Sequence, residues 1–211
     1  MNPKQKYYEN VAATIIQNLN NRQMNGYYCP DKESAVQKVL ELIPAGASIG
    51  WGGSQTLMET GILQAVGNGS YRVIDRDKAV TPEEQKQVYG QIFGCDYFLM
   101  STNAITLEGE LVNVDGRGNR VSFLCYGPEH VIVVAGMNKI VTDTDAGIKR
   151  TRNIAAPPNT VRLNRSTPCA VTGRCADCLS PDSICSQTVI TRRSHIPGRI
   201  TVILVGEELG Y

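Results

Sequence analysis

Apolar residues recur at three- and four-residue steps in three stretches of the chain, the spacing that places them on one face of a helix. The first stretch covers residues 8–19. The second covers residues 31–46, where Asp31 can cap the helix N-terminus, and the third covers residues 81–94, where Thr81 can open a capping box. The pattern therefore predicts three amphipathic helices.

Short runs rich in β-branched and aromatic residues lie between and after these helices, near residues 47, 71, 96, 130 and 199. Several are apolar on both faces, as buried strands are when helices cover both sides of a parallel sheet. The alternation predicts an α/β fold with a mostly parallel sheet flanked by helices. A single domain over residues 1–211 fits this length, with an N-terminal helical part over residues 1–45.

Residues 155–185 interrupt the alternation, because no clear apolar period runs through them. A structureless stretch of this length usually has a function or is held by a crosslink. We therefore predict a C-terminal cysteine-rich loop that is inserted before the last strands.

Composition narrows the choice of partners. The chain has 21 Lys and Arg residues against 20 Asp and Glu, a formal net charge of +1, spread along most of the sequence. Such a balance gives no overall field for nucleic acid or a membrane surface. The N-terminus lacks the continuous apolar segment of a signal peptide, and the longest strongly apolar run, residues 131–137, is too short to span a bilayer. We expect a soluble, cytoplasmic protein that does not bind nucleic acid.

A glycine-rich turn, SIGWGGSQT over residues 48–56, ends one predicted strand and leads into a helix that begins near Ser54. Unpaired backbone N–H groups and the helix dipole attract anions at such a turn. The glycines leave the backbone open to a ligand, and the hydroxyl groups add donors. An ordinary strand-to-helix turn capped by Ser54 explains the same residues. The candidate binding residues here are Gly50, Gly52, Gly53, Ser54 and Thr56.

A polar cluster over residues 101–121 follows the predicted strand near residue 96. Two short strands around a turn at Glu108 and Gly109, with a second turn over residues 115–119, account for the glycines of this segment. They do not account for the polar side chains that gather where an open α/β sheet binds its substrate. The candidate substrate-binding residues are Asn103, Asn113, Asp115, Gly116, Asn119 and Arg120.

Lys139 follows the buried strand near residue 130, where its side chain can reach a ligand at the carboxyl end of the sheet. It joins the candidate residues for binding an anion, and a solvated lysine fits the sequence equally well. Lys149, Arg150 and Arg152 lie on a predicted helix. For these three, a solvated helix face is the simpler interpretation.

Four of the seven cysteines fall in the segment CAVTGRCADCLSPDSIC. An odd cysteine count in a reducing compartment argues against a disulfide framework. The central Cys-x2-Cys pair has the spacing that lets two sulfurs hold one metal ion or cluster edge. The full spacing matches neither a ferredoxin nor a zinc ribbon, and structural or redox-active thiols are the alternatives. The candidate ligands of zinc or an iron–sulfur cluster are Cys169, Cys175, Cys178 and Cys185.

Several segments together resemble the LUD (lactate-utilisation) domain family, formerly DUF162, which includes LutC-type proteins. These segments are IGWGGSQTLMETG, NAITLEGELVNVDGRGNRV, YGPEHVIVVAGMNKIV, AAPPNTVRL and the cysteine segment. The resemblance extends from about residue 5 to the C-terminus, so it makes the whole chain one LUD domain. It implies the NagB/RpiA/CoA-transferase-like fold, shared by glucosamine-6-phosphate deaminases, ribose-5-phosphate isomerases and CoA transferases.

The resemblance also implies a function. It is that of a component of lactate utilisation that accompanies the iron–sulfur subunits of a lactate-oxidising system and binds a small anionic metabolite, namely a carboxylate, a phosphate or a CoA-like molecule. CoA-transferase relatives use a nucleophilic Glu beside a Gly, which makes Glu108 the candidate catalytic residue. Isomerase relatives have a catalytic Asp where this chain has Asn103. An exposed turn carboxylate is the simpler interpretation of Glu108.

Three functions stay open from the sequence. The first is a metabolite-binding protein of lactate catabolism, either a transferase-like enzyme or a component of an oxidoreductase complex. The second is an electron-transfer subunit that binds a metal ion or iron–sulfur cluster at the four cysteines. The third is a non-catalytic regulatory or interaction module. The apolar, helix-rich N-terminus is also a candidate contact surface for a homo-oligomer.

Overall fold

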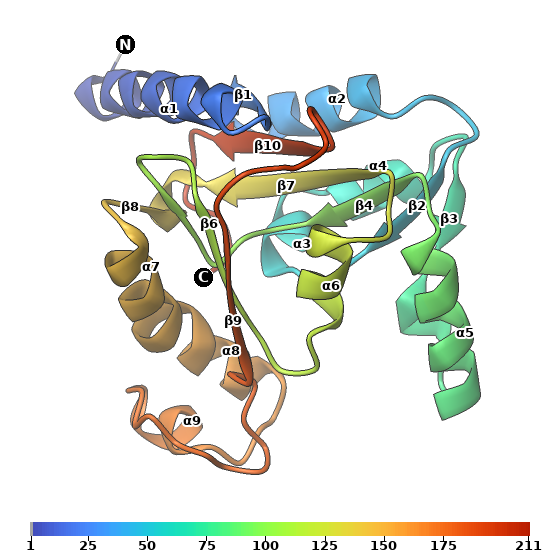
Figure 1. Cartoon of the computed structure of the whole chain (residues 1–211), viewed down its shortest axis with the longest axis vertical. Helices are drawn as coiled ribbons and strands as arrows, with labels where there is room; N and C mark the ends of the chain where they lie inside the picture. The colour runs from blue at the N-terminus through green and yellow to red at the C-terminus, as the bar shows by residue number, and fades with distance from the viewer. Residues whose placement is uncertain (1) are drawn as a thin grey trace.

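A six-stranded sheet forms the centre of the molecule in the computed structural model, which describes residues 2–211 (Figure 1). All neighbouring strands of this main sheet are parallel. The α/β class and the mostly parallel sheet that the sequence predicts are therefore confirmed. Across the sheet, the strands follow the order β1 (Asn25–Cys29), β10 (Ile200–Val205), β7 (His130–Gly136), β4 (Tyr97–Met100), β2 (Ser48–Trp51) and β3 (Arg72–Ile74).

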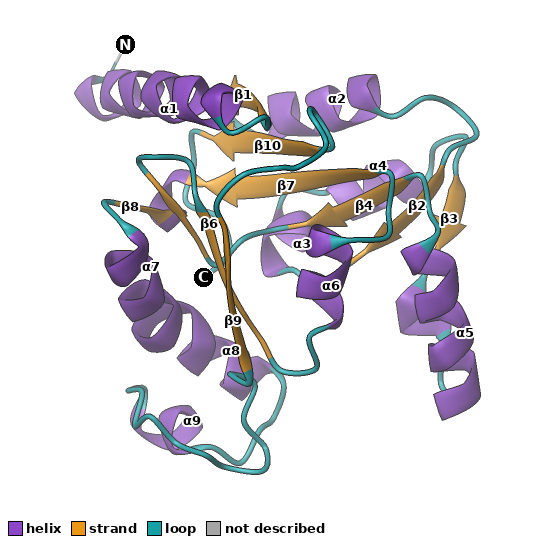
Figure 2. Ribbon diagram, in the orientation of Figure 1, coloured by secondary structure: helices purple, strands orange, loops and turns teal. Residues whose placement is uncertain are grey.

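Helices cover both faces of the main sheet (Figure 2). In strand β7, Val131 and Val133 join one buried core, whereas Ile132 and Val134 join the other. Successive side chains of a strand point to opposite faces, so a strand buried on both sides is apolar throughout. One face packs against α1 (Pro3–Asn21), α5 (Pro82–Phe93) and α6 (Asn119–Cys125), and the other against α2 (Lys32–Leu42), α3 (Gln55–Glu59) and α4 (Ile62–Gly67).

The three helices predicted from apolar spacing are α1, α2 and α5. The side chain of Asp31 accepts a hydrogen bond from the backbone N–H of Ser34 at 2.8 Å, which caps α2 as expected. Thr81 and Glu84 form the predicted capping box of α5, since each side chain accepts a hydrogen bond from the backbone N–H of the other residue. No helix within residues 2–211 is long and apolar enough to cross a membrane.

A second, smaller sheet packs beside the main one and contains the predicted hairpin. Strands β5 (Ala104–Thr106) and β6 (Leu111–Asp115) are antiparallel and are joined by the turn at Glu108 and Gly109, where Gly109 has a φ of +84° that favours glycine. The sequence predicted this turn but not the two outer strands, whose runs are short. In order, the small sheet contains β8 (Ile140–Val141), β5 (Ala104–Thr106), β6 (Leu111–Asp115) and β9 (Gln187–Thr191).

Residues 155–185 are more regular than the predicted loop. Helix α7 (Thr144–Arg150) continues through a π-helical turn, η3 (Thr151–Ala155), into α8 (Ala156–Arg162), and α9 (Pro168–Thr172) follows. Irregular backbone is confined to residues 163–167 and 173–186. The buried residues of α8 are Ala156, Pro157 and Thr160, none of them a large hydrophobic residue, so an apolar period is missing although the helix is present.

The order of the strands reverses next to β2. From β2 the chain passes outward to β3, continues through the short helix η1 (Arg76–Lys78) and α5, and then returns to β4 on the other side of β2. In an open α/β sheet, a crevice forms at the carboxyl ends of the strands where the order reverses in this way. The fold therefore places a binding crevice beyond Trp51 and Met100, the last residues of β2 and β4.

Candidate functional site

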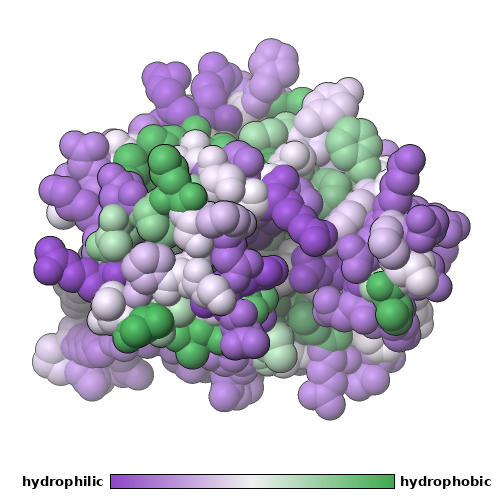
Figure 3. All heavy atoms as spheres, turned by 90° about the horizontal axis from the view of Figure 1, so that it is seen from below, coloured by the Kyte–Doolittle hydropathy of each residue, from purple (hydrophilic) through white to green (hydrophobic). Residues whose placement is uncertain are grey.

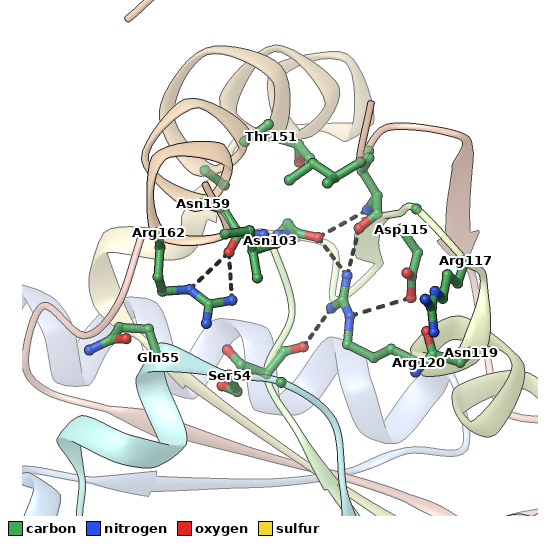
Figure 4. Close-up of a pocket in the computed structure, with 18 of the residues that line it drawn as sticks. Ser54, Gln55, Asn103, Asp115, Arg117, Asn119, Arg120, Thr151, Asn159 and Arg162 are labelled. Atoms are coloured by element: carbon green, nitrogen blue, oxygen red, sulfur yellow. Dashed lines mark hydrogen bonds and ion pairs between the residues drawn. The ribbon is translucent and has the colours of Figure 1, made fainter. Parts of the chain in front are cut away.

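A pocket with a volume of about 570 Å³ opens at the carboxyl ends of the central strands (Figure 4). Strand β2 leads into Gly53 and Ser54, strand β4 leads into Ser101, and strand β7 leads into the short helix η2 (Met137–Lys139). These strands are neighbours in the sheet, so the residues that follow them meet at one edge. The pocket thus lies where the reversal of strand order puts it.

The other side of the pocket comes from segments outside the main sheet. The segment around the bend between β6 and α6 contributes residues 114–117, 119 and 120. The helices after α7 contribute Thr151 and Asn159, and the end of the cysteine segment contributes residues 181–184 and 186. The face seen from below in Figure 3 is mostly hydrophilic, with hydrophobic side chains in smaller groups. Most of the residues that line the pocket are polar or charged, so it is a polar space between the sheet edge and the C-terminal helices.

The glycine-rich turn contributes less open backbone than predicted. A Cβ atom on Gly50 would lie 2.8 Å from Cγ1 of Ile92, and one on Gly52 would lie 3.2 Å from Cγ of Arg120, so close packing explains both glycines. Of the three glycines of this turn, only Gly53 lines the pocket. Ser54 caps α3, because its hydroxyl accepts a hydrogen bond from the backbone N–H of Leu57 at 3.2 Å.

Helix α3 has only five residues, so its dipole is small and any strong attraction for an anion must come from side chains.

Arg120 is the centre of the inner wall (Figure 4). Its guanidinium donates to the side-chain oxygens of Asn103 at 2.9 Å and Asn113 at 2.7 Å, and to the carbonyl oxygens of Ser101 at 2.9 Å and Val114 at 2.7 Å. Burial lowers the pKa of Arg120, and the Asp115 carboxylate opposes this. Arg120 therefore ties β4, β5 and β6 together, and its donors are largely used within the protein.

The bend after β6 is fixed by Asp115. Its carboxylate accepts hydrogen bonds from the backbone N–H groups of Gly118 at 3.4 Å and Val121 at 3.3 Å, and it lies 3.7 Å from Nε of Arg120. The negative charge of Asp115 is thus balanced inside the wall. Among the other predicted binding residues, those that line the pocket on this bend are Gly116 and Asn119.

Lys139 is the most deeply buried of the basic residues around the pocket, with 3% of its surface exposed. Its Nζ donates to the hydroxyl oxygens of Thr56 at 2.9 Å and Ser101 at 3.0 Å. Burial lowers the pKa of Lys139 to about 7, the charges of Arg150 and Arg120 also lower it, and Glu59 opposes them. The structure thus brings Lys139 and Thr56 into the same wall as the predicted cluster after β4.

Basic residues outnumber acidic ones around the pocket, six to two. The two carboxylates are both paired, Asp115 with Arg120 and Asp182 with Arg165 at 3.1 Å. Arg117 makes no hydrogen bond or ion pair with another residue in the described range 2–211, and Arg162 donates only to Asn159. Figure 4 shows Arg117 and Arg162 on opposite sides of the pocket. The six basic residues are Arg76, Arg117, Arg120, Lys139, Arg162 and Arg165.

Four of these basic residues are absent from the sequence-based candidates, namely Arg76, Arg117, Arg162 and Arg165. They come from separate elements, and only the fold brings them together. Arg150, expected on a solvated helix face, is instead buried and donates to the carbonyl oxygens of Asn138 at 2.9 Å and Asn103 at 2.6 Å. No local signal distinguishes such a residue from an exposed helical arginine.

Glu108, the predicted nucleophile, does not line the pocket. Its side chain is exposed in the β5–β6 turn, its carbonyl oxygen accepts a hydrogen bond from Nε of Arg22 at 2.6 Å, and Gly109 packs against Leu19 of helix α1. Asn113 also lies outside the lining, fully buried behind Asn103. The catalytic role of Glu108 therefore stays a prediction, and this pocket does not support it.

The four cysteines of the C-terminal segment are free thiols. Burial raises the pKa of Cys185, and the charges of the other three cysteines raise it further. The four side chains do not converge on one point: Cys169 is buried, with its Sγ 3.3 Å from the hydroxyl of Thr167. No set of three or more His, Cys, Asp or Glu side chains within residues 2–211 is arranged to hold a metal ion. The predicted zinc or iron–sulfur site is therefore not supported, and structural thiols fit Cys169.

Fold and site together define an α/β protein with a basic pocket at the carboxyl ends of a parallel sheet. The model of the LUD domain matches residues 12–205, so the chain belongs to the LUD domain family. The resemblance seen in the sequence is thereby confirmed. Among curated proteins, no sequence matches the chain.

The chain is similar in structure to a DUF162 family protein from Deinococcus radiodurans, with 16% identity and a TM-score of 0.52, over 94% of this chain and 98% of that one. Ribose 5-phosphate isomerases also match, over a smaller part of the chain. The enzyme from Neisseria gonorrhoeae has 16% identity and a TM-score of 0.35 over 53% of each chain. The enzyme from Methanocaldococcus jannaschii has 16% identity and a TM-score of 0.36, over 63% of this chain and 62% of that one.

Proposed function

We propose that this LUD domain binds a small anionic metabolite, a carboxylate or a phosphate compound, in the pocket at the carboxyl ends of β2, β4 and β7, as a component of lactate utilisation. The observation that carries the proposal is the charge of the pocket wall. Six basic residues line it, while its two carboxylates are already paired with arginines of the same wall. An anion is the ligand that such a wall attracts.

The basic residues without an ion-pair partner are the groups that would hold the ligand. Arg117 and Arg162 can each present a guanidinium fork to a carboxylate or phosphate, and Ser54 adds a hydroxyl on the side of the sheet. Arg120 keeps this wall rigid, because its donors fix the segments after β4 and β6. The volume of about 570 Å³ lies within the usual range for small-molecule sites.

The open crevice also favours binding over the alternative of a purely structural interaction module, for which we would expect the protein's own side chains to fill it. The cysteine segment favours no second function, because its thiols are not arranged around an ion. Association with iron–sulfur subunits stays a prediction from the family resemblance, and self-association stays a prediction from the apolar N-terminal segment.

The test is a binding panel with the purified protein: lactate, pyruvate, inorganic phosphate, ribose 5-phosphate and CoA, measured by thermal shift and calorimetry. A ligand of the pocket raises the melting temperature. Arg117→Ala and Arg162→Ala should each weaken its binding about tenfold or more, because each removes a charged hydrogen bond worth roughly 1.5–3 kcal/mol.

The matched control is Lys86→Ala, which removes an exposed cation from helix α5, outside the pocket. It should bind the ligand like the unmodified protein. If no compound of the panel shifts the melting temperature, or if the two arginine variants bind as tightly as the Lys86→Ala control, the proposal is wrong.

A further inference from the structure

Lys139 carries an amine into the pocket without a carboxylate partner. Its Nζ hydrogen-bonds to two neutral hydroxyl groups, those of Thr56 at 2.9 Å and Ser101 at 3.0 Å. None of the ion pairs formed among residues 2–211 includes Lys139. Nζ lies in the same wall as the groups proposed to bind an anion.

Burying an ammonium group without a counter-ion costs free energy, because burial removes its hydration and no opposite charge compensates for the loss. Here the surroundings make the cost larger, since Arg120 and Arg150 lie close enough to repel a positive charge on Nζ. Burial first, and then these two arginines, lower the pKa of Lys139 to about 7, while Glu59 raises it slightly. A substantial fraction of the protein therefore has a neutral amine at neutral pH.

A neutral lysine amine in a desolvated site is a nucleophile, whereas an ammonium group has no free electron pair. Most lysines lack this property at neutral pH because water keeps them charged. The hydroxyls of Thr56 and Ser101 fix Nζ in place. Backbone carbonyl oxygens lie close behind both hydroxyls, those of Leu209 and Thr102 at 3.4 Å. The position of Nζ is thus set from two sides.

We infer that Lys139 forms a Schiff base with a small carbonyl compound that bears a carboxylate or phosphate group. The inference rests on the proposed function, because the basic wall would hold the anionic group while the carbonyl carbon meets Nζ. The electron pair of Nζ attacks the carbonyl carbon and a C–N bond forms. The carbonyl oxygen gains two protons and leaves as water, so amine plus carbonyl gives imine plus water. The step needs no oxidant or reductant.

The protonated imine carries a positive charge, which the same two arginines, Arg120 and Arg150, repel. The protein therefore stabilises this imine less than water stabilises an ordinary ammonium ion. The anionic group of the bound compound compensates for this repulsion. An uncharged aldehyde or ketone of similar size lacks such compensation. We therefore expect the reaction to select anionic carbonyl compounds, and lactate, which has no carbonyl carbon outside its carboxylate, to bind without reacting.

The experiment traps the imine. The protein is incubated with pyruvate or with dihydroxyacetone phosphate in the presence of cyanoborohydride, and intact mass and peptide mapping follow. We expect one added substrate residue per chain, located on the peptide that contains Lys139, and competition by lactate or inorganic phosphate. The choice of probes also decides between a carboxylate and a phosphate as the anionic group.

Two variants and one control keep the result unambiguous. Lys139→Met and Lys139→Arg remove the nucleophile and should give no adduct at this position, and the arginine variant keeps hydrogen-bond donors for Thr56 and Ser101. Lys86→Met, at an exposed site on α5, should still be labelled at Lys139. A circular dichroism spectrum shows that each variant is folded.

The outcomes separate this inference from the proposed function. If pyruvate or dihydroxyacetone phosphate raises the melting temperature but no reductant-dependent adduct forms at Lys139, the Schiff base is ruled out and the anion site stands. If adducts spread evenly over surface lysines, the inference is equally overturned. If neither compound binds while inorganic phosphate does, the pocket holds an anion and the carbonyl class is wrong.

Discussion

Arg120 and Lys139, two buried basic residues a short distance apart, have different roles because their side chains differ. Arg120 offers a planar fork of donors, and four oxygen acceptors of the surrounding chain match it. Lys139 is a single charged point with only hydroxyl groups beside it. The guanidinium stays charged after burial, because its ordinary pKa is far above neutrality, whereas the amine can lose its proton.

This difference predicts how stability depends on pH. In the unfolded chain Lys139 keeps its proton up to its ordinary pKa of 10.5, whereas in the folded protein it loses the proton above about 7. Between these pH values the unfolded state binds more protons, so the free energy of unfolding should rise with pH, by up to about 1.4 kcal/mol per pH unit.

Urea unfolding at several pH values between about 7.5 and 9.5 measures this slope. Lys139→Met should lack the rise, while Lys86→Met, with its exposed lysine replaced, should keep it. Parallel profiles for all three proteins would show that Lys139 titrates like a solvated lysine.

At the scale of elements, close packing between β2 and α5 explains why the glycine-rich turn contains Gly50. Strand β2 lies so near helix α5 that a methyl group on Gly50 would be 2.8 Å from Cγ1 of Ile92. Side chains of η1 and α6 also approach the turn, Arg76 at Gly53 and Arg120 at Gly52. The glycines are therefore needed to seat β2 under a helix, and the binding role falls to the side chains around the turn.

Gly50→Ala should destabilise the protein by about 1–3 kcal/mol, because a packed core resists an added methyl group. Combined with Ile92→Ala, the cost should be less than the sum of the two single changes, since the second change makes room for the first. Urea unfolding measures all three variants. Gly67→Ala, on α4 with no atom within 4 Å of the new methyl group, is the control and should be close to neutral. Strict additivity would contradict the packing explanation.

The sequence predicted the elements that have large apolar residues at regular spacing, and it predicted their caps at Asp31 and Thr81. It missed α8, whose buried side is made of Ala, Pro and Thr, and the short edge strands. For the site it found the residues that follow strands, such as Ser54, Asn103 and Lys139. It could not find Arg76 or Arg162, because only the three-dimensional arrangement brings those helices to the pocket.

Over the whole molecule, positive and negative charges almost balance, whereas the residues around the pocket carry an excess of positive charge. A net charge of +1 gives little long-range attraction, so the electrostatic contribution to binding comes from the few cations near the ligand. A partly enclosed site is screened less than an exposed surface, so its attraction should persist at physiological salt.

We expect the affinity for a pocket ligand such as inorganic phosphate or pyruvate to fall several-fold, rather than by orders of magnitude, between about 50 and 500 mM NaCl. Calorimetry over this range provides the slope. Arg117→Ala should reduce the slope, because Arg117 is exposed and salt therefore screens its charge. An affinity independent of salt would mean that charge does not drive binding.

The position of β10 also bears on how the molecule forms. Strand β10 lies between β1 and β7, although it follows both in the chain. Strand β1 therefore has no partner in the main sheet until residues 200–205 have been synthesised. Helix α1 lacks the completed sheet for the same time. During translation, the apolar faces of these early segments stay without a sheet to cover them, which gives chaperones or other nascent-chain factors their longest opportunity to bind there.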